Sequence, residues 1–354
     1  MLFGHVAGPA GAAGAAGVFC CGLRVVSMDG SVTDVPDSDK NAAFFGRPSN
    51  QSRDGAFPQA RWVAAAESGT GSLLGAAIGR YTDAGQPLAA DLLGCFGPGM
   101  VVLADRRFLS WAAARAFLAA GAHLLWRASA SFALRPVQVL ADGTYLAELK
   151  PPRKKDGPAV TVRVIEYTVH TTAGDGGEQT SEVFCLVTDL LDVEEYPALD
   201  LACAYPLRWG CETVIGHHTT DMGEGQPVLR SGDPAGVMQE MWALFAVYQA
   251  ISRLTGIAVD AAGIPPDQIS FPHALAAATA TVAAFPPEQA GLAFATFLAK
   301  VLMPAFFPRD RPGRASPRKT KKAGDFPARK PGEPSVTKVT RTIEFHLLCP
   351  WQLT

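Results

Sequence analysis

The sequence predicts an α/β fold in which a mixed sheet with flanking helices is interrupted by an all-β insertion. Three observations carry this prediction. Short apolar runs rich in Val, Leu and Ala alternate with helical patterns over residues 22–127. Val, Thr and Tyr then take alternating positions over 129–190, with Asp-Gly turns between the runs. Helical patterns return from residue 197 onward.

The composition fits a globular chain. The 354 residues are 48% hydrophobic and 18% charged with a formal net charge of −2, which excludes collagen-like, mucin-like and wholly disordered classes. Seven cysteines without CxxC or Cys/His spacing indicate neither a disulfide framework nor a zinc site and favour a reducing cytoplasm. The apolar stretch 291–307 is broken by Lys300 and Pro304, so no membrane span is predicted.

The elements of the first half follow from these patterns in chain order. Gly, Ala and Pro make residues 1–18 a poor helix, and no basic segment typical of a signal peptide is present, so a loop is predicted there. Leu23–Met28 is a β-rich run that reaches Asp29, and the pattern resumes after Gly30, which predicts a hairpin or a bulged strand. A loop is predicted over 37–55. Strands are then predicted at 59–67, 72–81, 100–104 and 122–127, and helices at 87–96 and 110–120.

Helices dominate the second half. A helical pattern covers 197–222, and Asp233 as N-cap with Pro234 at the first helical position begins another that extends to 254. Two more helices are predicted at 270–285 and 287–302. From residue 308 the chain is Pro-rich and basic, with eleven Lys or Arg against three Asp or Glu over 309–341, and is predicted to be mobile.

Two carboxylates share one sequence setting. Asp29 follows Val-Val-Ser-Met and Asp105 follows Val-Val-Leu-Ala, so an apolar strand holds each of them rigidly. A charge beside a core strand costs desolvation free energy unless a partner or a metal ion compensates it. The alternative for each is a turn cap, which is an ordinary role for Asp at a strand end.

A third acidic residue lies in a helical pattern. Tyr205, Arg208 and Glu212 fall on one helix face because offsets of three and seven residues span one and two turns. The alternative is an ordinary Arg/Glu pair on a solvated face. Strand Asp, strand Asp, then helix Glu is the order of an RNase H-like nuclease core. Three converging carboxylates repel one another unless Mg²⁺ or Mn²⁺ offsets the charge, and two such ions support in-line attack on a phosphate.

The ordered motifs resemble the DDE transposases of the insertion-sequence-four group. The resemblance covers roughly residues 1 to 320, and its motifs are Arg24-Val-Val-Ser-Met-Asp29-Gly-Ser31, Phe45-Gly-Arg-Pro48, Val101-Val-Leu-Ala-Asp105-Arg106, Leu125-Trp-Arg127, Tyr205-x-x-Arg208-Trp-x-x-Glu212, Val228-Leu-Arg-Ser231 and Gln239-Glu240-x-Trp242. It implies cut-and-paste DNA chemistry, in which a metal-activated water cuts the strand at a transposon end. The freed 3′-hydroxyl then attacks a second phosphodiester.

The resemblance also implies residue roles and partners. Asp29, Asp105 and Glu212 would be the catalytic metal ligands, with Mg²⁺ or Mn²⁺ as cofactor. Tyr205 and Arg208 match the family's Tyr-Arg-Glu-Lys signature and would hold a DNA backbone phosphate. The implied partners are transposon-end and target DNA, with a homodimer in a synaptic complex and no membrane. The predicted location is the cytoplasm, in association with the nucleoid, and a composition high in Ala, Gly, Pro and Arg but low in Lys indicates a GC-rich bacterial genome.

Three features depart from the family pattern. The signature Lys position holds Thr219, and the neighbouring His217 and His218 are predicted to be exposed and to point elsewhere. Arg107 stands where the family has Gly and is predicted to crowd the metal site. Only 28 residues precede Asp29, where relatives carry a DNA-binding region, so the chain is predicted to be N-terminally truncated. These departures favour the alternative of a catalytically inactive DNA-binding remnant of a transposase. A third interpretation is an unrelated metal hydrolase that uses the same carboxylates.

The basic segment near the C-terminus has its own interpretation. Arg318, Lys319, Lys321 and Lys322 are suited to phosphate contacts, and in a nuclease-type chain they favour DNA binding over a merely solvated end. Trp209 is predicted to serve core packing, with contact to DNA, next to Arg208, as the alternative. Together these predictions divide the chain into an irregular N-terminal remnant (1–21), the first part of the catalytic core (22–127), the β-rich insertion (128–192), the second part of the core with the Glu helix (193–256), C-terminal helices (257–307) and the basic tail (308–354).

Overall fold

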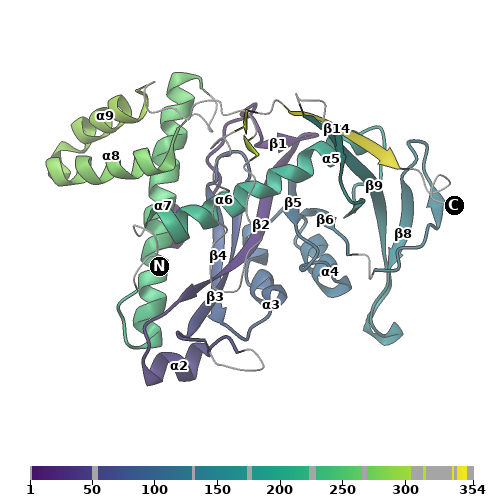
Figure 1. Cartoon of the computed structure of the whole chain (residues 1–354), viewed down its shortest axis with the longest axis horizontal. Helices are drawn as coiled ribbons and strands as arrows, with labels where there is room; N and C mark the ends of the chain where they lie inside the picture. Colours follow the sequence, from purple (N-terminus) through teal and green to yellow (C-terminus); the bar gives the residue numbers. More distant parts are fainter. Residues whose placement is uncertain are drawn as a thin grey trace.

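Twelve strands of the described residues form a mixed sheet that runs through the centre of the protein (Figure 1). The computed structural model describes residues 2–49, 55–129, 132–173, 178–222, 229–264, 269–303, 314–315, 337–338 and 341–348. Five strands of the sheet follow the order β4-β3-β2-β5-β6. Their bounds are β2 Leu23–Asp34, β3 Gln59–Glu67, β4 Leu73–Arg80, β5 Met100–Ala104 and β6 His123–Arg127.

The direction of these five strands defines the fold. β2, β5 and β6 are parallel to one another, whereas β3 and β4 are antiparallel additions at the β2 side. Parallel neighbours need crossover connections, and helices between β4 and β5 and between β5 and β6 provide them. This is the arrangement of an RNase H-like core, so the predicted fold class is confirmed.

The β-rich insertion continues the same sheet. β11 (Phe184–Thr188) pairs antiparallel with β6 and, on its other side, with β9 (Val160–Ala173). The remaining insertion strands are β7 (Gln138–Val139), β8 (Tyr145–Leu149) and β10 (Glu178–Thr180). Figure 1 shows β8 and β9 at the side of the molecule opposite to the long helix α7.

Among the described residues, four strands lie where none was predicted. β14 (Arg341–Leu348) pairs along β9 over eight residues, so the prediction of a mobile segment beyond residue 308 is wrong for this part. β12 (Arg314–Ala315) and β13 (Thr337–Lys338) pair with each other. A further short strand, β1 (Phe19–Cys20), pairs with the start of β2.

Helices cover both faces of the sheet. α3 (Gly85–Ala90) and α4 (Trp111–Ala119) pack on one face, in the core that contains Met28 and Ala104. On the opposite face lie α5 (Ala198–Ala204), α6 (Trp209–Gly216), α7 (Pro234–Ala262) and, around them, α1 (Leu2–Val6), α2 (Asp39–Phe45), α8 (Phe271–Ala284) and α9 (Ala290–Val301). α7 is long and apolar enough to span a membrane, but half of its most apolar stretch is buried inside the protein, as in the core helix of a globular fold.

Two segments predicted as loops contain short helices. α1 forms because Phe3 packs against Trp242, with ring centroids 5.4 Å apart, and against Phe245 on α7. α2 forms because Ser38 caps it, accepting a hydrogen bond from the Asn41 backbone N–H at 3.1 Å, and because Phe45 is buried. Tertiary packing and capping outweigh the weak helical propensity of these segments.

The strand that carries the first acidic residue is continuous. β2 pairs with β3 without interruption from Val26 to Asp34, so the predicted hairpin or bulge at Asp29-Gly30 is absent. The glycine serves close packing instead, because a Cβ atom on Gly30 would lie 3.0 Å from the carbonyl oxygen of Trp62 on β3.

The predicted helix over 197–222 is divided. α5 gives way to a 3₁₀ turn, Tyr205–Arg208, before α6 begins, and a π-helical turn, His217–Asp221, follows α6. Pro206 explains the division because it has no N–H to continue the α5 ladder. The Asp233 N-cap is confirmed, since the Gly236 N–H donates to its carboxylate at 3.0 Å.

Candidate active site

Two neighbouring parallel strands bring Asp29 and Asp105 side by side. Met28 on β2 is the register partner of Ala104 on β5, and each aspartate is the next residue of its chain. Met28 and Ala104 are buried on the α3 and α4 side. Because successive side chains of a strand point to opposite faces, both aspartates face the other side, where α5 and α6 lie.

Close contacts hold α6 against this part of the sheet. The Ser27 hydroxyl on β2 donates to the Leu207 carbonyl at 3.2 Å, and the buried Cys211 thiol contacts the Ala64 carbonyl on β3 at 3.7 Å. Gly210 lies so near the β3–β4 turn that a Cβ atom on it would be 2.7 Å from the Ser68 carbonyl oxygen. These contacts fix where Glu212, two residues further along α6, can lie.

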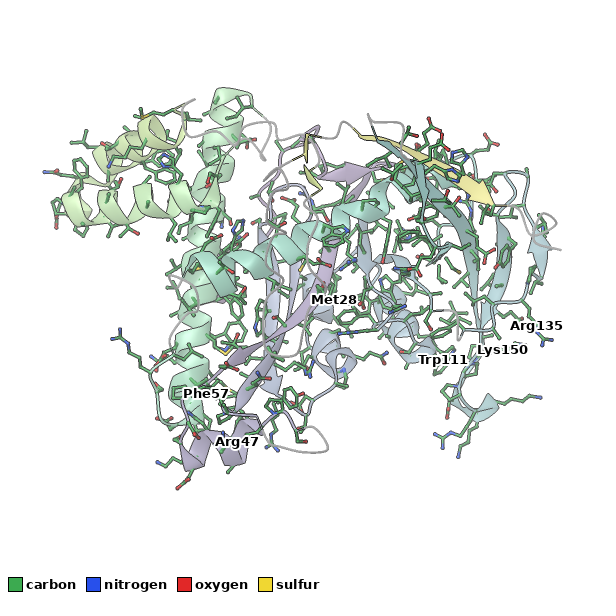
Figure 2. All side chains as sticks on the ribbon, in the orientation of Figure 1. Met28, Arg47, Phe57, Trp111, Arg135 and Lys150 are labelled. Atoms are coloured by element: carbon green, nitrogen blue, oxygen red, sulfur yellow. The ribbon has the colours of Figure 1, made fainter. Side chains whose placement is uncertain are left out.

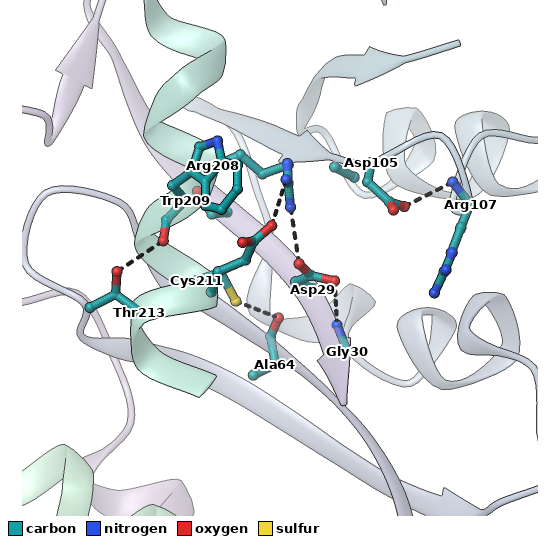
Figure 3. Close-up of polar contacts among 12 residues, drawn as sticks. Asp29, Gly30, Ala64, Asp105, Arg107, Arg208, Trp209, Cys211 and Thr213 are labelled. Carbon is teal, nitrogen blue, oxygen red and sulfur yellow. Dashed lines mark hydrogen bonds and ion pairs between the residues drawn. The ribbon is translucent and has the colours of Figure 1, made fainter. Parts of the chain in front are cut away.

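Arg208 joins the first and third acidic residues. Its guanidinium donates from Nη1 to Asp29 Oδ2 at 3.0 Å and from Nη2 to Glu212 Oε1 at 2.7 Å (Figure 3). The Arg208 side chain is only 12% exposed. The pair with Glu212 is therefore part of a half-buried network and differs from the solvated surface pair that was the alternative prediction.

Backbone amides orient the two aspartates. The Gly30 N–H donates to Asp29 Oδ1 and the Arg107 N–H to Asp105 Oδ1, each at 2.8 Å. Figure 3 shows the Arg107 side chain on the side of Asp105 away from Arg208. Arg107 is exposed and does not crowd the space between the acidic residues, contrary to the prediction.

Opposing influences act on the pKa of the Asp29 carboxyl. Burial raises the pKa of the Asp29 carboxyl above its usual range, while the Gly30 N–H and the Arg208 cation act to lower it. The negative charges of Asp105 and Glu212 add to the rise of this pKa. Asp29 is thus within electrostatic reach of both Asp105 and Glu212.

The arrangement differs from a preformed metal cage. Among the described residues, no group of three or more His, Cys, Asp or Glu side chains is close enough to hold one ion. A cation, the Arg208 guanidinium, lies between two of the three acidic residues. The oxygen-only donor set matches a hard divalent ion in chemistry, but Asp29 and Glu212 fit one only once Arg208 releases them.

Tyr205 supports the strand end next to Asp105. It is buried, and its hydroxyl donates to the Ala104 carbonyl at 3.3 Å. Burial raises the pKa of Tyr205 to about 12, which keeps the phenol neutral. This position favours a positioning role for Tyr205 and leaves Arg208 as the residue of this pair with its charged end at the site.

Beyond Glu212, the position of the family's Lys is held by Thr219, which does not supply a second basic contact. The Thr219 hydroxyl donates to the Ile215 carbonyl of its own helix at 2.9 Å. His218 is buried against Trp62, Phe245 and Tyr248, so the prediction of exposure is wrong for it. His217 pairs instead with Asp221 at 2.6 Å.

Two further predictions have different outcomes. Trp209 is 62% exposed, so the prediction of core packing is wrong for this residue. Arg318, Lys319, Lys321 and Lys322 of the basic segment lie outside the described residues. Their predicted contact with DNA stays a prediction.

Sequence reasoning missed the residues that position the acidic ones. Ser27 is fully buried and its hydroxyl also contacts the Ser68 hydroxyl, which ties β2 to the β3–β4 turn. A polar residue inside the apolar run Val25-Val26-Ser27-Met28 was the available signal. Gly210 gave no signal, because its need for a small side chain comes from a contact with a distant segment.

The site belongs to the RNase H-like class, because two strand-borne aspartates lie beside a helix-borne glutamate on an RNase H-like core. No protein-family model matches the chain. Over 262 residues the chain is 27% identical to the transposase InsG for insertion sequence element IS4 of Escherichia coli, a match that covers 71% of this chain and 57% of that protein. The resemblance to insertion-sequence-four transposases is thereby confirmed, and the chain spans little more than half the length of this relative.

A solved structure is also similar to this chain. It is the cryo-EM structure of the piggyBac transposase synaptic complex with hairpin DNA, with a TM-score of 0.41 and 11% sequence identity. The match covers 82% of this chain and 59% of that chain.

Proposed function

We propose that this chain is a DNA transposase that cleaves and transfers strands at the ends of an insertion sequence in a metal-dependent reaction. One observation carries the proposal. Asp29 and Asp105 directly follow register partners on the neighbouring parallel strands β2 and β5, and Glu212 is linked to Asp29 through Arg208. Similarity to a transposase along most of the chain supports it.

The proposed chemistry assigns a task to each side chain. Bound Mg²⁺ or Mn²⁺ would supply Lewis acidity and a lowered pKa for a bound water. Asp29, Asp105 and Glu212 would hold the ions through carboxylate oxygens. Arg208 would exchange its two carboxylate partners for a backbone phosphate of the DNA, to which a guanidinium can donate two parallel hydrogen bonds. Tyr205 would keep the end of β5, and hence Asp105, in place.

A catalytically inactive DNA-binding remnant is the second candidate function. The bridging position of Arg208 favours it, since two of the three acidic residues are already neutralised by a side chain. Thr219 favours it as well, because its hydroxyl is bonded within its own helix and carries no charge.

A cleavage assay separates these functions. The substrate is end-labelled DNA that carries the terminal inverted repeats flanking the coding sequence, incubated with the protein and Mg²⁺ or Mn²⁺. We expect cutting at the repeat ends that Asp105→Asn abolishes and that Asp91→Asn, an exposed acidic residue on the α3 side, leaves unchanged.

The other outcomes are equally distinct. Salt-sensitive DNA binding without any cutting would identify the inactive remnant. Cutting that ignores the end sequence would identify an unrelated metal hydrolase instead. We further propose a homodimer that joins two DNA ends, and a cytoplasmic, nucleoid-associated location that follows from a DNA substrate. Light scattering with and without end DNA tests the dimer.

A further inference from the structure

A strongly basic hairpin protrudes from the β-rich insertion, far along the chain from the acidic residues. The β8–β9 connection reads Lys150-Pro-Pro-Arg153-Lys154-Lys155, and we call these six residues the basic hairpin. Its four cationic side chains are all exposed. Figure 2 shows Lys150 and Arg135 in the same region, and both residues line one hollow of about 480 Å³.

Two of the four cations of the basic hairpin have ion-pair partners, and both pairs are exposed. Arg153 contacts Asp156 at 3.2 Å and Lys150 contacts Glu148 at 3.5 Å, both as exposed surface pairs. Within the part of the chain that the structure describes, Lys154 and Lys155 have no ion-pair partner. Exposed pairs of this kind are weak and are readily exchanged for another anion.

The backbone that directly follows the basic hairpin is held in place by contacts with α4. The Trp111 indole N–H of α4 donates to the Pro158 carbonyl at 2.9 Å, and Arg115 of α4 donates to the Asp156 carbonyl at 3.4 Å. A short 3₁₀ turn, Lys154–Asp156, is closed by the Asp156 carboxylate on the Arg153 N–H. Pro151 and Pro152 further restrict the backbone.

Gly157 makes the close contact with α4 possible. Its φ of +141° lies in a region that disfavours other residues. A Cβ atom there would lie 2.5 Å from Arg115 Nη1 and 3.2 Å from the Trp111 ring. Residues 156–158, which directly follow the basic hairpin, therefore dock on the first turns of α4, the helix that begins six residues after Asp105.

We infer that the basic hairpin is a docking surface for the phosphate backbone of duplex DNA. Closely spaced cations on a restrained loop suit a partner with regularly spaced phosphates, since little conformational freedom is lost on binding. Attachment to α4 fixes these cations relative to Asp105, so DNA that contacts both would be held at a constant offset from the acidic residues. The inference rests on the proposed function and adds a binding surface to it.

The test is the salt dependence of DNA binding. A fluorescent 30-base-pair duplex of random sequence is titrated with the full chain and with the double variant Lys154→Ala/Lys155→Ala between 50 and 200 mM salt. Each lost phosphate contact lowers the slope of log affinity against log salt by about 0.9, so we expect a decrease of about 2. The affinity advantage of the unmodified chain then shrinks about tenfold across this fourfold range of salt.

Matched controls keep the outcomes distinct. Lys40→Ala removes an exposed lysine of α2 and should leave the slope unchanged, and Lys154→Arg/Lys155→Arg should retain the slope of the unmodified chain. Equal slopes for the unmodified chain and the double alanine variant would overturn the inference and leave the proposed function standing. Absence of duplex binding by the unmodified chain would overturn both. Lysine-dependent binding to phosphatidylserine vesicles with no effect on DNA would assign the surface to a membrane and also overturn the inference.

Discussion

Replacing Gly210 by alanine tests whether close packing of α6 against the sheet sets the position of Glu212. A Cβ atom at this position would lie 2.7 Å from the Ser68 carbonyl oxygen and 3.4 Å from two more Ser68 backbone atoms. Since the obstacle is backbone, α6 must move away from the β3–β4 turn. Gly216 at the end of the same helix is the matched control, because nothing lies within 4 Å of its added Cβ atom.

The two substitutions should change stability in opposite directions. Alanine in place of glycine stabilises a helix by roughly 0.5–1 kcal/mol, which is the gain expected for Gly216→Ala. At Gly210 the same gain is opposed by an overpacking cost of about 1–3 kcal/mol, so a net loss of about 1 kcal/mol is expected. Urea unfolding monitored by circular dichroism measures both values. The reasoning would be refuted if Gly210→Ala stabilised the protein as much as Gly216→Ala does.

Three further substitutions have defined outcomes. Arg208→Gln leaves two half-buried carboxylates without their cation and should lower the free energy of unfolding by about 2–3 kcal/mol at pH 7. This is below the 3–5 kcal/mol of a fully buried pair because Glu212 is 34% exposed. A loss under about 0.5 kcal/mol in urea melts would show that the pair is solvated. Arg163→Met removes a fully buried guanidinium that pairs with Asp142 and donates hydrogen bonds to the Leu190 and Tyr196 carbonyls, so we expect the free energy of unfolding to fall by about 3 kcal/mol or more. Arg153→Met at the surface should lower it by less than about 1 kcal/mol. Equal urea midpoints for the two variants would contradict this. Burial lowers the pKa of His218 to about 3, so only the unfolded chain takes up its proton as the pH falls below about 6.5, and stability should drop by about 2 kcal/mol between pH 7 and 5 from this residue alone. His218→Phe should remove that part of the decline, and parallel pH profiles of the two proteins in urea melts would count against the burial of a neutral imidazole.

The fold was predictable where local patterns agree with tertiary packing. The strands β3, β5 and β6 are visible in the sequence because burial on both faces requires continuous apolar residues. The Asp233 cap of α7 is visible because a helix start favours a side chain that accepts hydrogen bonds. α1 and α2 were missed because contacts with α7 and a single serine cap stabilise them. β14 was missed because its pairing partner β9 is distant in the chain, and strand pairing at that separation leaves no local pattern.

The sequence grouped Asp29, Asp105 and Glu212 as candidates through the order of strand Asp, strand Asp and helix Glu, and it did not predict the contacts among them. In the structure Asp29 lies inside β2 and is linked to Glu212 through Arg208. The bridging contact of Arg208 with Asp29 was not predictable, because it depends on how the 3₁₀ turn at Tyr205–Arg208 aims the guanidinium across to β2. The positioning roles of Ser27 and Gly210 likewise arise from contacts between segments that no local spacing reveals.

The pairing of β11 with β6 has a consequence for how such a core can vary. The chain leaves the core at Arg127 and comes back at Leu186, which is the register partner of Arg127. Strands can therefore be added or lost between these two points while the connection to α5 begins from the same place. Selection could lengthen, shorten or recharge the outer strands, including the hairpin that carries Lys154 and Lys155, without shifting the strands and helix on which the acidic residues stand.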